Sequence, residues 1–144
     1  MRASDVQAFR LAVGRIGRRL RQLYLTSSSE PPLAPLELSL LVRLRQEKSA
    51  SPGEVARAER VTPQAVAIAI RGLIERGFVV RVRQVTDRRR AVVTITPAGT
   101  AYLRSRDDAV AEPLAAALRT ALTPEERANL PAVVDLLERV ASAL

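Results

Sequence analysis

The chain has 144 residues and a mass of 15.7 kDa, which is enough for one compact domain, and 47% of its residues are apolar, as in globular proteins. It contains no cysteine and no histidine, which excludes disulfides and thiol redox sensing and argues against the usual transition-metal sites. The net charge of +8 favours an anionic partner, and the absence of both a long apolar run and a secretory signal pattern predicts a cytoplasmic protein without membrane spans.

The first predicted element is a helix over roughly residues 4 to 25. Its apolar residues recur at spacings of three and four and form a heptad-like seam, made of Val6, Phe9, Val13, Ile16, Leu20 and Leu23. The Ser- and Pro-rich stretch TSSSEPPLAP ends this helix. A second helix is expected over about 36 to 47.

The starts of the later helices are marked by a proline that follows a serine or threonine. The four signals are SPGE at 51, TPQA at 62, TPAG at 96 and TPEE at 123, each an N-cap followed by Pro in the first turn. They predict helices over about 52–59, 63–76, 97–119 and 124–142. Pro113 should kink or split the third of these. The last helix carries a second apolar seam, made of Leu130, Val133, Leu137, Val140 and Leu144.

Two strands are predicted between these helices, at about 79–85 and 90–95. The alternation predicts that Val80 and Val82 face inward while Arg81 faces outward with Arg83. The inward face of the partner strand would consist of Ala91, Val93 and Ile95. The hairpin tip would then be the charged run 87–90.

The helices over 52–59 and 63–76 are joined by about three residues, which is the spacing of a helix-turn-helix. In the second of them the core stripe is predicted to be Val66, Ala69, Ile70 and Leu73. The opposite side, made of Gln64, Ala65, Ile68, Arg71 and Gly72, is then free to enter a major groove, where Arg71 can meet a base edge or a phosphate. The alternative interpretation is an ordinary helical hairpin.

The charges are unevenly distributed along the chain. Residues 51–90 contain nine arginines and four acids, whereas residues 107–138 contain two arginines and seven acids. This is typical of a nucleic-acid face beside a solvated assembly face. The run Asp87–Arg90 could be a solvated turn, but directly after a helix-turn-helix it is interpreted as a wing that places an arginine in the minor groove.

The helix-turn-helix, followed by LIERGFVVRVRQVTDRRRAVVTITPAG and ALTPEERANLPAVVDLLERV, resembles the MarR family of winged helix-turn-helix regulators. The most specific matching pieces are Leu73, Gly77, Phe78, the run 87–89, and Ile95, Thr96 and Gly99. The resemblance implies a mainly α fold with a small β-hairpin wing, in a single unit over 1–144. Residues 1–30 and 97–144 would form a helical dimerisation lobe, and residues 34–96 the winged helix-turn-helix. It further implies a homodimer on a pseudo-palindromic DNA site, usually a repressor relieved by a small molecule.

The predicted DNA-binding residues are Thr62, Pro63, Gln64, Ala65, Ile68, Arg71, Arg81, Asp87, Arg88, Arg89 and Arg90. In the wing, Arg89 is assigned to the minor groove, Arg88 and Arg90 to phosphates, and Asp87 to holding a guanidinium in place. Ile68 departs from the polar or basic residue common in the family. It either packs against thymine methyl groups or belongs partly to the core.

A small aromatic or apolar anion is the expected effector, with Phe9, Arg15, Arg18 and Tyr24 as candidate lining residues. A plain core role for the two aromatic side chains is the alternative. No cofactor, metal or catalytic site is predicted, because no nucleophile–base pair or ligand cluster can be assembled from the sequence. The alternative functions are a non-specific architectural nucleic-acid-binding protein and a protein-interaction module.

Overall fold

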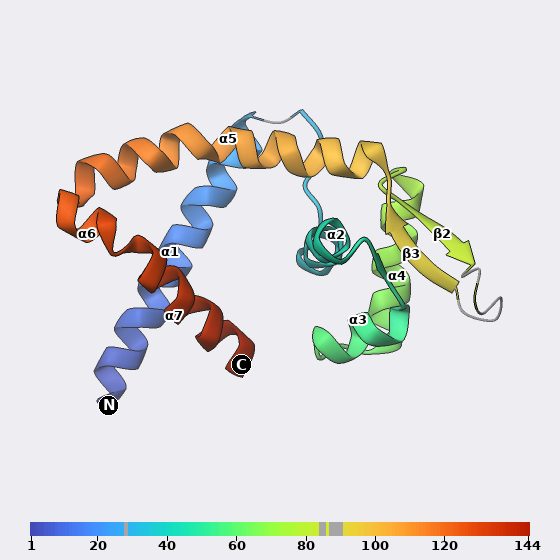
Figure 1. Ribbon diagram of the computed structural model, residues 1–144, viewed down its shortest axis with the longest axis horizontal. Coiled ribbons are helices and arrows are strands. Elements are labelled where there is room, and N and C mark those ends of the chain that lie inside the picture. Colours follow the sequence, from blue (N-terminus) through green and yellow to red (C-terminus); the bar gives the residue numbers. More distant parts are fainter. Residues whose placement is uncertain (28, 84–85, 87–90) are drawn as a thin grey trace. The chain divides into compact units, whose positions relative to one another are not determined.

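The computed structural model describes residues 1–27, 29–83, 86 and 91–144 (Figure 1). The chain divides into two compact units, one made of residues 1–27 and 108–144 and the other of residues 28–107. The elements, in chain order, are α1 (Ala3–Ser27), α2 (Pro35–Glu47), β1 (Ser49–Ala50), α3 (Pro52–Ala58), α4 (Pro63–Glu75), β2 (Val79–Arg83), β3 (Ala91–Ile95), α5 (Pro97–Ala121), α6 (Pro124–Ala128) and α7 (Leu130–Ala143). The predicted mainly α fold with a small hairpin is confirmed.

The unit formed by residues 28–107 is built around α4. This helix contacts both α2 and α3, and Figure 1 shows the hairpin of β2 and β3 extending from its C-terminal end. The side chains at the centre of the core have no solvent exposure, and they are Leu40, Leu41, Leu44, Val55, Val66, Ile70 and Leu73. The predicted core stripe of α4 is therefore confirmed. It fixes which side of this helix is free.

The short strand β1 was not predicted from the sequence. It pairs antiparallel with β3, with Ser49 opposite Thr94 and Ala50 opposite Val93, so the sheet has the order β1-β3-β2. Two residues are too few to give an alternating pattern, so only the pairing itself defines this strand. It attaches the base of the hairpin to the chain between α2 and α3.

The hairpin register contradicts one prediction about its faces. Arg81 lies opposite Val93, and residues directly opposite each other in an antiparallel pair share a face. Val93 is buried, so Val80 and Val82 lie on the other face, where they are 46% and 44% exposed. In β2 the buried side chain is Val79, at the strand's base. An alternating Val-Arg pattern shows that two faces exist, but packing decides which of them is covered.

The predicted final helix over 124–142 is wrong, because the structure contains two helices there, α6 and α7, with Asn129 between them. Pro131 has no N–H to donate to the carbonyl of Arg127, which would be its partner in an uninterrupted helix. By contrast, α5 continues as one helix through Pro113, so the alternative in which that proline splits the helix is wrong. The alanine-rich sequence around Pro113 favours helix and helps the chain tolerate the lost hydrogen bond.

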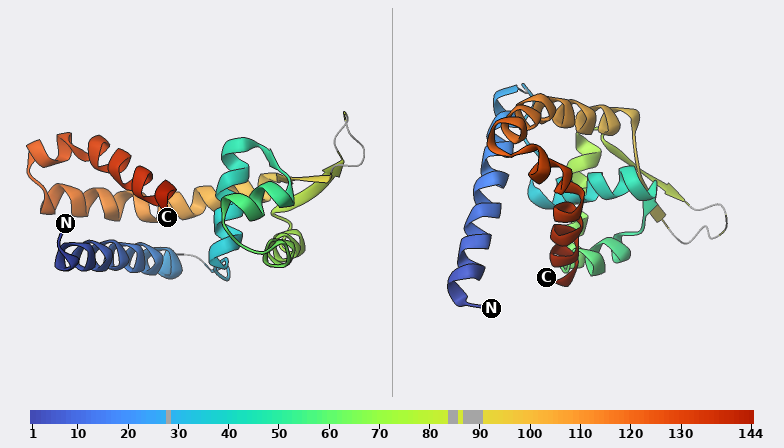
Figure 2. Two further views of the ribbon diagram at one scale, coloured as in Figure 1. Left: turned by 90° about the horizontal axis from the view of Figure 1, so that it is seen from below. Right: turned by 60° about the vertical axis from the view of Figure 1, so that its left-hand side comes forward.

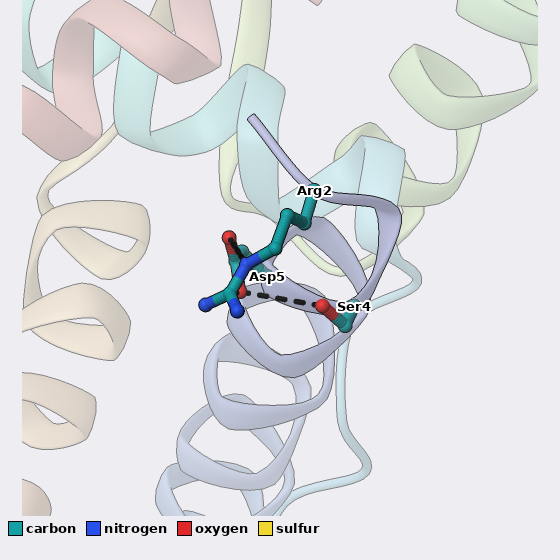
Figure 3. Close-up of polar contacts among 3 residues, drawn as sticks. All are labelled: Arg2, Ser4 and Asp5. Atoms are coloured by element: carbon teal, nitrogen blue, oxygen red, sulfur yellow. Dashed lines mark hydrogen bonds and ion pairs between the residues drawn. The ribbon is translucent and has the colours of Figure 1, made fainter.

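The other unit contains α1, the second part of α5, α6 and α7. At the start of α1, Arg2 forms an ion pair with Asp5 through Nε and Oδ2 at 3.1 Å, and the Ser4 hydroxyl donates to the same carboxylate at 3.4 Å (Figure 3). These groups are exposed, so they add little stability beyond the favourable position of an acid in a first helical turn.

Most of the surface of α7 is exposed to solvent in the single chain. Figure 2 shows α6 as the turn between α5 and α7, and none of the residues of α7, all of which are described, is buried. In α1 the buried residue is Tyr24. Both helices expose apolar side chains, including Phe9 and Ile16 in α1 and Val134 and Leu136 in α7. Among the described residues, no helix is long and apolar enough to cross a membrane.

Candidate nucleic-acid interface

One side of α4 is an exposed stripe that we call the α4 outer face, made of Gln64, Ala67, Ile68, Arg71 and Glu75. These residues lie three and four positions apart, so they share one side of the helix, and all are exposed. The buried stripe on the opposite side fixes the rotation of α4 about its axis. The α4 outer face is therefore the exposed side of an α-helix, and the major groove of DNA admits an α-helix.

Ile68 belongs to this exposed surface. Its side chain is 68% exposed, which excludes the alternative in which it was partly core. Ala65 and Gly72, which were predicted to point away from the core, are partly buried and lie at the margin of the stripe. Gly72 is close to the carboxylate of Glu37 on α2. Ala67 takes their place on the outer face, and the spacing of Gln64, Ala67, Ile68 and Arg71 was the sequence signal for it.

The turn between α3 and α4 has a defined backbone geometry. Arg60 has φ 52°, and the N–H groups of Arg60 and Val61 donate to the carbonyls of Arg57 and Ala56 at 3.3 and 3.1 Å. This is a Schellman-type helix end in which arginine occupies the position usually taken by glycine. The turn that joins α3 to α4 is therefore held by backbone hydrogen bonds.

The N-terminus of α4 is capped by Thr62, whose Oγ1 accepts from the Ala65 N–H at 3.2 Å. Thr62 and Pro63 are both exposed there. The remaining free N–H groups of a first helical turn, with the positive end of the helix dipole, favour a phosphate at this position. The assignment of Thr62 and Pro63 to a DNA surface stays a prediction.

A second set of hydrogen bonds holds the base of the hairpin. Gly77 has φ 74°, and the Phe78 N–H donates to the Leu73 carbonyl at 2.9 Å, which ends α4 in a Schellman-type turn. The Thr96 hydroxyl donates to the Gly77 carbonyl at 2.6 Å, and the Gly99 N–H donates to the same hydroxyl oxygen at 3.1 Å. Thus the end of α4, the start of β2 and the start of α5 are joined at one point.

The chain matches the MarR family model over residues 33–91. It is also 35% identical to an uncharacterized HTH-type transcriptional regulator of Mycobacterium bovis, over 94% of this chain and 89% of that protein. The chain belongs to the MarR family. Members of this family are transcriptional regulators rather than enzymes, which confirms that the chain is not an enzyme.

Solved structures show the same fold. The YusO protein of Bacillus subtilis is 21% identical with a TM-score of 0.67, over 96% of this chain and 99% of that chain. Streptococcus pneumoniae FabT, solved in complex with DNA, is 16% identical with a TM-score of 0.76, over 99% of each chain. At these identities the likeness concerns the fold, and it confirms the winged helix-turn-helix architecture of a MarR-family protein.

The wing of this MarR-family chain is described only at its base. Arg81 is exposed on β2 although it shares a face with the buried Val93, and its assignment to a DNA surface stays a prediction. Asp87, Arg88, Arg89 and Arg90 lie outside the described residues, so their assigned roles stay predictions.

A basic residue that the sequence analysis did not select is Arg57, exposed on α3. It lines a shallow groove of about 650 Å³ beside β1 together with Arg43, Glu47, Ser51 and Glu54. Arg43 pairs with Glu47 at 3.5 Å, so the groove carries both signs of charge. Because β1 was not predicted, no sequence pattern placed α2, α3 and β3 around a common groove.

The four predicted effector residues of the MarR-family lobe do not line one described hollow. Arg15 and Arg18 line a hollow on α1 with Arg19 and Gln22. A second, more apolar hollow of about 540 Å³ is lined by Arg19, Gln22, Leu23, Leu25, Thr26 and Pro113. Neither lining includes Phe9, which is 48% exposed, or Tyr24, which is buried. Within the described part of the chain, no three acidic side chains lie close enough together to hold a metal ion.

Proposed function

We propose that this MarR-family protein is a sequence-specific DNA-binding repressor that acts as a homodimer on a pseudo-palindromic operator. The observation that carries the proposal is the α4 outer face. Its exposed side chains stand on a helix whose opposite side is fully buried, so they are presented at a fixed rotation. The FabT structure in complex with DNA supports the proposal, since it has the same fold.

Each predicted residue has a role in this proposal. Gln64 and Arg71 read base edges in the major groove, and Ile68 packs against thymine methyl groups. Thr62, Pro63 and Ala65 bring the α4 N-terminus to a phosphate. Arg81 approaches the backbone beside the wing, where Arg89 enters the minor groove, Arg88 and Arg90 neutralise phosphates, and Asp87 holds a neighbouring guanidinium.

The homodimer is proposed from the apolar surface of α1 and α7. Val133, Leu137 and Val140 form one apolar side of α7, and they are 44%, 40% and 44% exposed. An apolar side of this kind needs a partner surface, and a second copy of the chain supplies one with two-fold symmetry. Two symmetry-related copies of α4 would then meet half-sites about 10 bp apart.

We further propose that a small aromatic or apolar anion relieves repression by binding at the α1 hollows. Arg15, Arg18 and Arg19 supply positive charge there, and Leu23 and Leu25 supply apolar surface. The ligand must bind more tightly to a dimer whose two α4 helices are wrongly spaced for DNA than to the DNA-binding dimer. A tenfold loss of DNA affinity requires a difference of about 1.4 kcal/mol between these two ligand-binding free energies.

The proposed function is tested by selecting fragments of the source genome with the purified protein and footprinting those that bind. We expect protection with two-fold symmetry and selected fragments that share an inverted repeat. Arg71→Ala should weaken binding more than the matched control Arg104→Ala, since both remove one exposed arginine but only Arg71 lies on α4. Equal binding of selected and random DNA would instead identify a non-specific architectural protein.

The dimer is tested by sedimentation at micromolar protein. Leu137→Glu places a charge in the apolar side of α7 and should shift the wild-type dimer to a monomer. A monomeric wild-type protein would refute the two-fold model.

For the effector, aromatic acids such as salicylate are screened by thermal shift, and each hit is then titrated against operator binding. Hits that stabilise the protein without weakening operator binding would refute ligand relief.

A further inference from the structure

Arg76 follows the last residue of α4 and contacts three separate stretches of the chain. Its Nη2 donates to the carbonyl of Pro31 at 2.7 Å and lies 3.5 Å from the Glu30 carboxylate. Its Cζ lies 4.8 Å from the ring centre of Phe78 and 5.3 Å from that of Tyr102. We call Arg76, Pro31, Phe78 and Tyr102 the Arg76 cluster. Every one of these residues belongs to the 28–107 unit.

The aromatic side chains of this cluster are buried and make a contact of their own. The ring centres of Phe78 and Tyr102 are 4.8 Å apart, and each residue is only 6% exposed. The Tyr102 hydroxyl accepts from the N–H of Leu33 at 3.3 Å. Leu33 is itself buried, so this N–H would be left unsatisfied in the interior without that hydroxyl.

The cluster lies where the chain enters and leaves this unit. The segment 29–34 connects α1 to this unit, and α5 connects this unit to the following residues of the other unit, with the boundary between the units after residue 107. Pro31 and Leu33 belong to the first connection, and Tyr102 belongs to the second. Both connections to the helices of the proposed dimer are thus attached to the C-terminal end of α4.

We propose that Arg76 is a positioning residue that sets the orientation of α4, and therefore of the α4 outer face, relative to both connections. The inference rests on the proposed function and deepens it. Arginine suits this role because its planar group stacks on aromatic rings while its N–H groups donate in fixed directions, which the ammonium group of lysine cannot reproduce. Arg76 does not read DNA in this arrangement, since it is engaged within the protein.

The first test needs no DNA and uses hydrogen exchange at the Leu33 amide, followed by NMR. Pro31 and Pro32 have no N–H, so the Leu33 amide is the first backbone reporter after the contact between Arg76 and Pro31. We expect faster exchange at Leu33 in Arg76→Gln and in Tyr102→Phe, and wild-type exchange in Arg104→Gln, which removes an exposed arginine of α5 in the same unit. Unchanged exchange in Arg76→Gln would overturn the proposal.

The second test measures the affinity of the full-length variants for a genomic fragment selected by the wild-type protein, over a range of salt concentrations. We expect Arg76→Gln to bind roughly 2- to 30-fold more weakly with an unchanged salt slope, because it loses orientation rather than a phosphate contact. Arg76→Lys should keep the charge and recover only part of this loss.

Three further results would overturn the inference. Wild-type affinity in Arg76→Gln, despite faster exchange at Leu33, would leave Arg76 with a role in stability alone. A salt slope reduced by about 0.9 would make it a direct phosphate contact. Failure of the wild-type protein itself to select any fragment would refute the proposed function together with this inference, whereas the other two outcomes leave the proposed function intact.

Discussion

Replacing Gly99 by alanine should destabilise the protein although the residue lies in the first turn of a helix. A Cβ built on Gly99 would lie 2.9 Å from Ile95 Cγ1 and 3.1 Å from the carbonyl carbon of Phe78, and closer still to the Phe78 oxygen. That oxygen accepts the Thr96 N–H at 3.0 Å, so it cannot move away without weakening the junction of β2 and α5. Forced overpacking of this kind typically costs about 1–3 kcal/mol.

The matched control is Gly53→Ala in α3 of the same unit. A Cβ at Gly53 would meet only the end of the Arg57 side chain, at 3.9 Å, and alanine in a helix is favoured over glycine by about 0.5–1 kcal/mol. Urea unfolding monitored by circular dichroism should therefore show a lower midpoint for Gly99→Ala and a midpoint at or above wild type for Gly53→Ala. A Gly99→Ala protein as stable as wild type would refute the steric argument.

Three further predictions concern α4 and the wing. Ile68→Ala should weaken operator binding but change the free energy of unfolding by no more than about 0.5 kcal/mol. Ile70→Ala, which removes a buried side chain, should lower the free energy of unfolding by about 2–5 kcal/mol in urea unfolding. Equal losses of stability in the two variants would contradict the exposed position of Ile68. Gly77→Ala should lower the free energy of unfolding by about 1–2 kcal/mol because φ is 74°, and its urea midpoint should fall accordingly; an unchanged midpoint would contradict this. Arg89→Ala should weaken operator binding by about 1–3 kcal/mol in gel-shift titration, and unchanged affinity of a folded variant would exclude the wing hypothesis.

The helix starts and the core stripe of α4 could be predicted because their causes are local. Ser51, Thr62 and Thr123 each accept a hydrogen bond from the backbone three residues later, which depends only on neighbouring residues. The apolar spacing in α4 likewise follows from the period of a single helix. These local rules identified the helix-turn-helix without knowledge of any distant contact.

Other features depend on residues far apart in the chain. Strand β1 exists through its pairing with β3, and the covered face of the hairpin depends on what packs against it rather than on its alternating sequence. The break between α6 and α7 was open to prediction from Pro131, yet the same rule applied to Pro113 would have split α5 wrongly. The number of hydrogen bonds that a proline removes is fixed locally, but whether the helix continues depends on its surroundings.

The sequence by itself determined the class of protein, because a capped helix pair, an arginine-rich hairpin and two apolar seams can each be recognised from residues that are close together in the sequence. Only the tertiary structure excluded the alternative in which Ile68 belongs partly to the core, and only it brought Arg76 against Pro31 and Tyr102. The physical reason is that a side chain's exposure and its distant partners depend on how helices and strands pack together, and no local spacing encodes that packing.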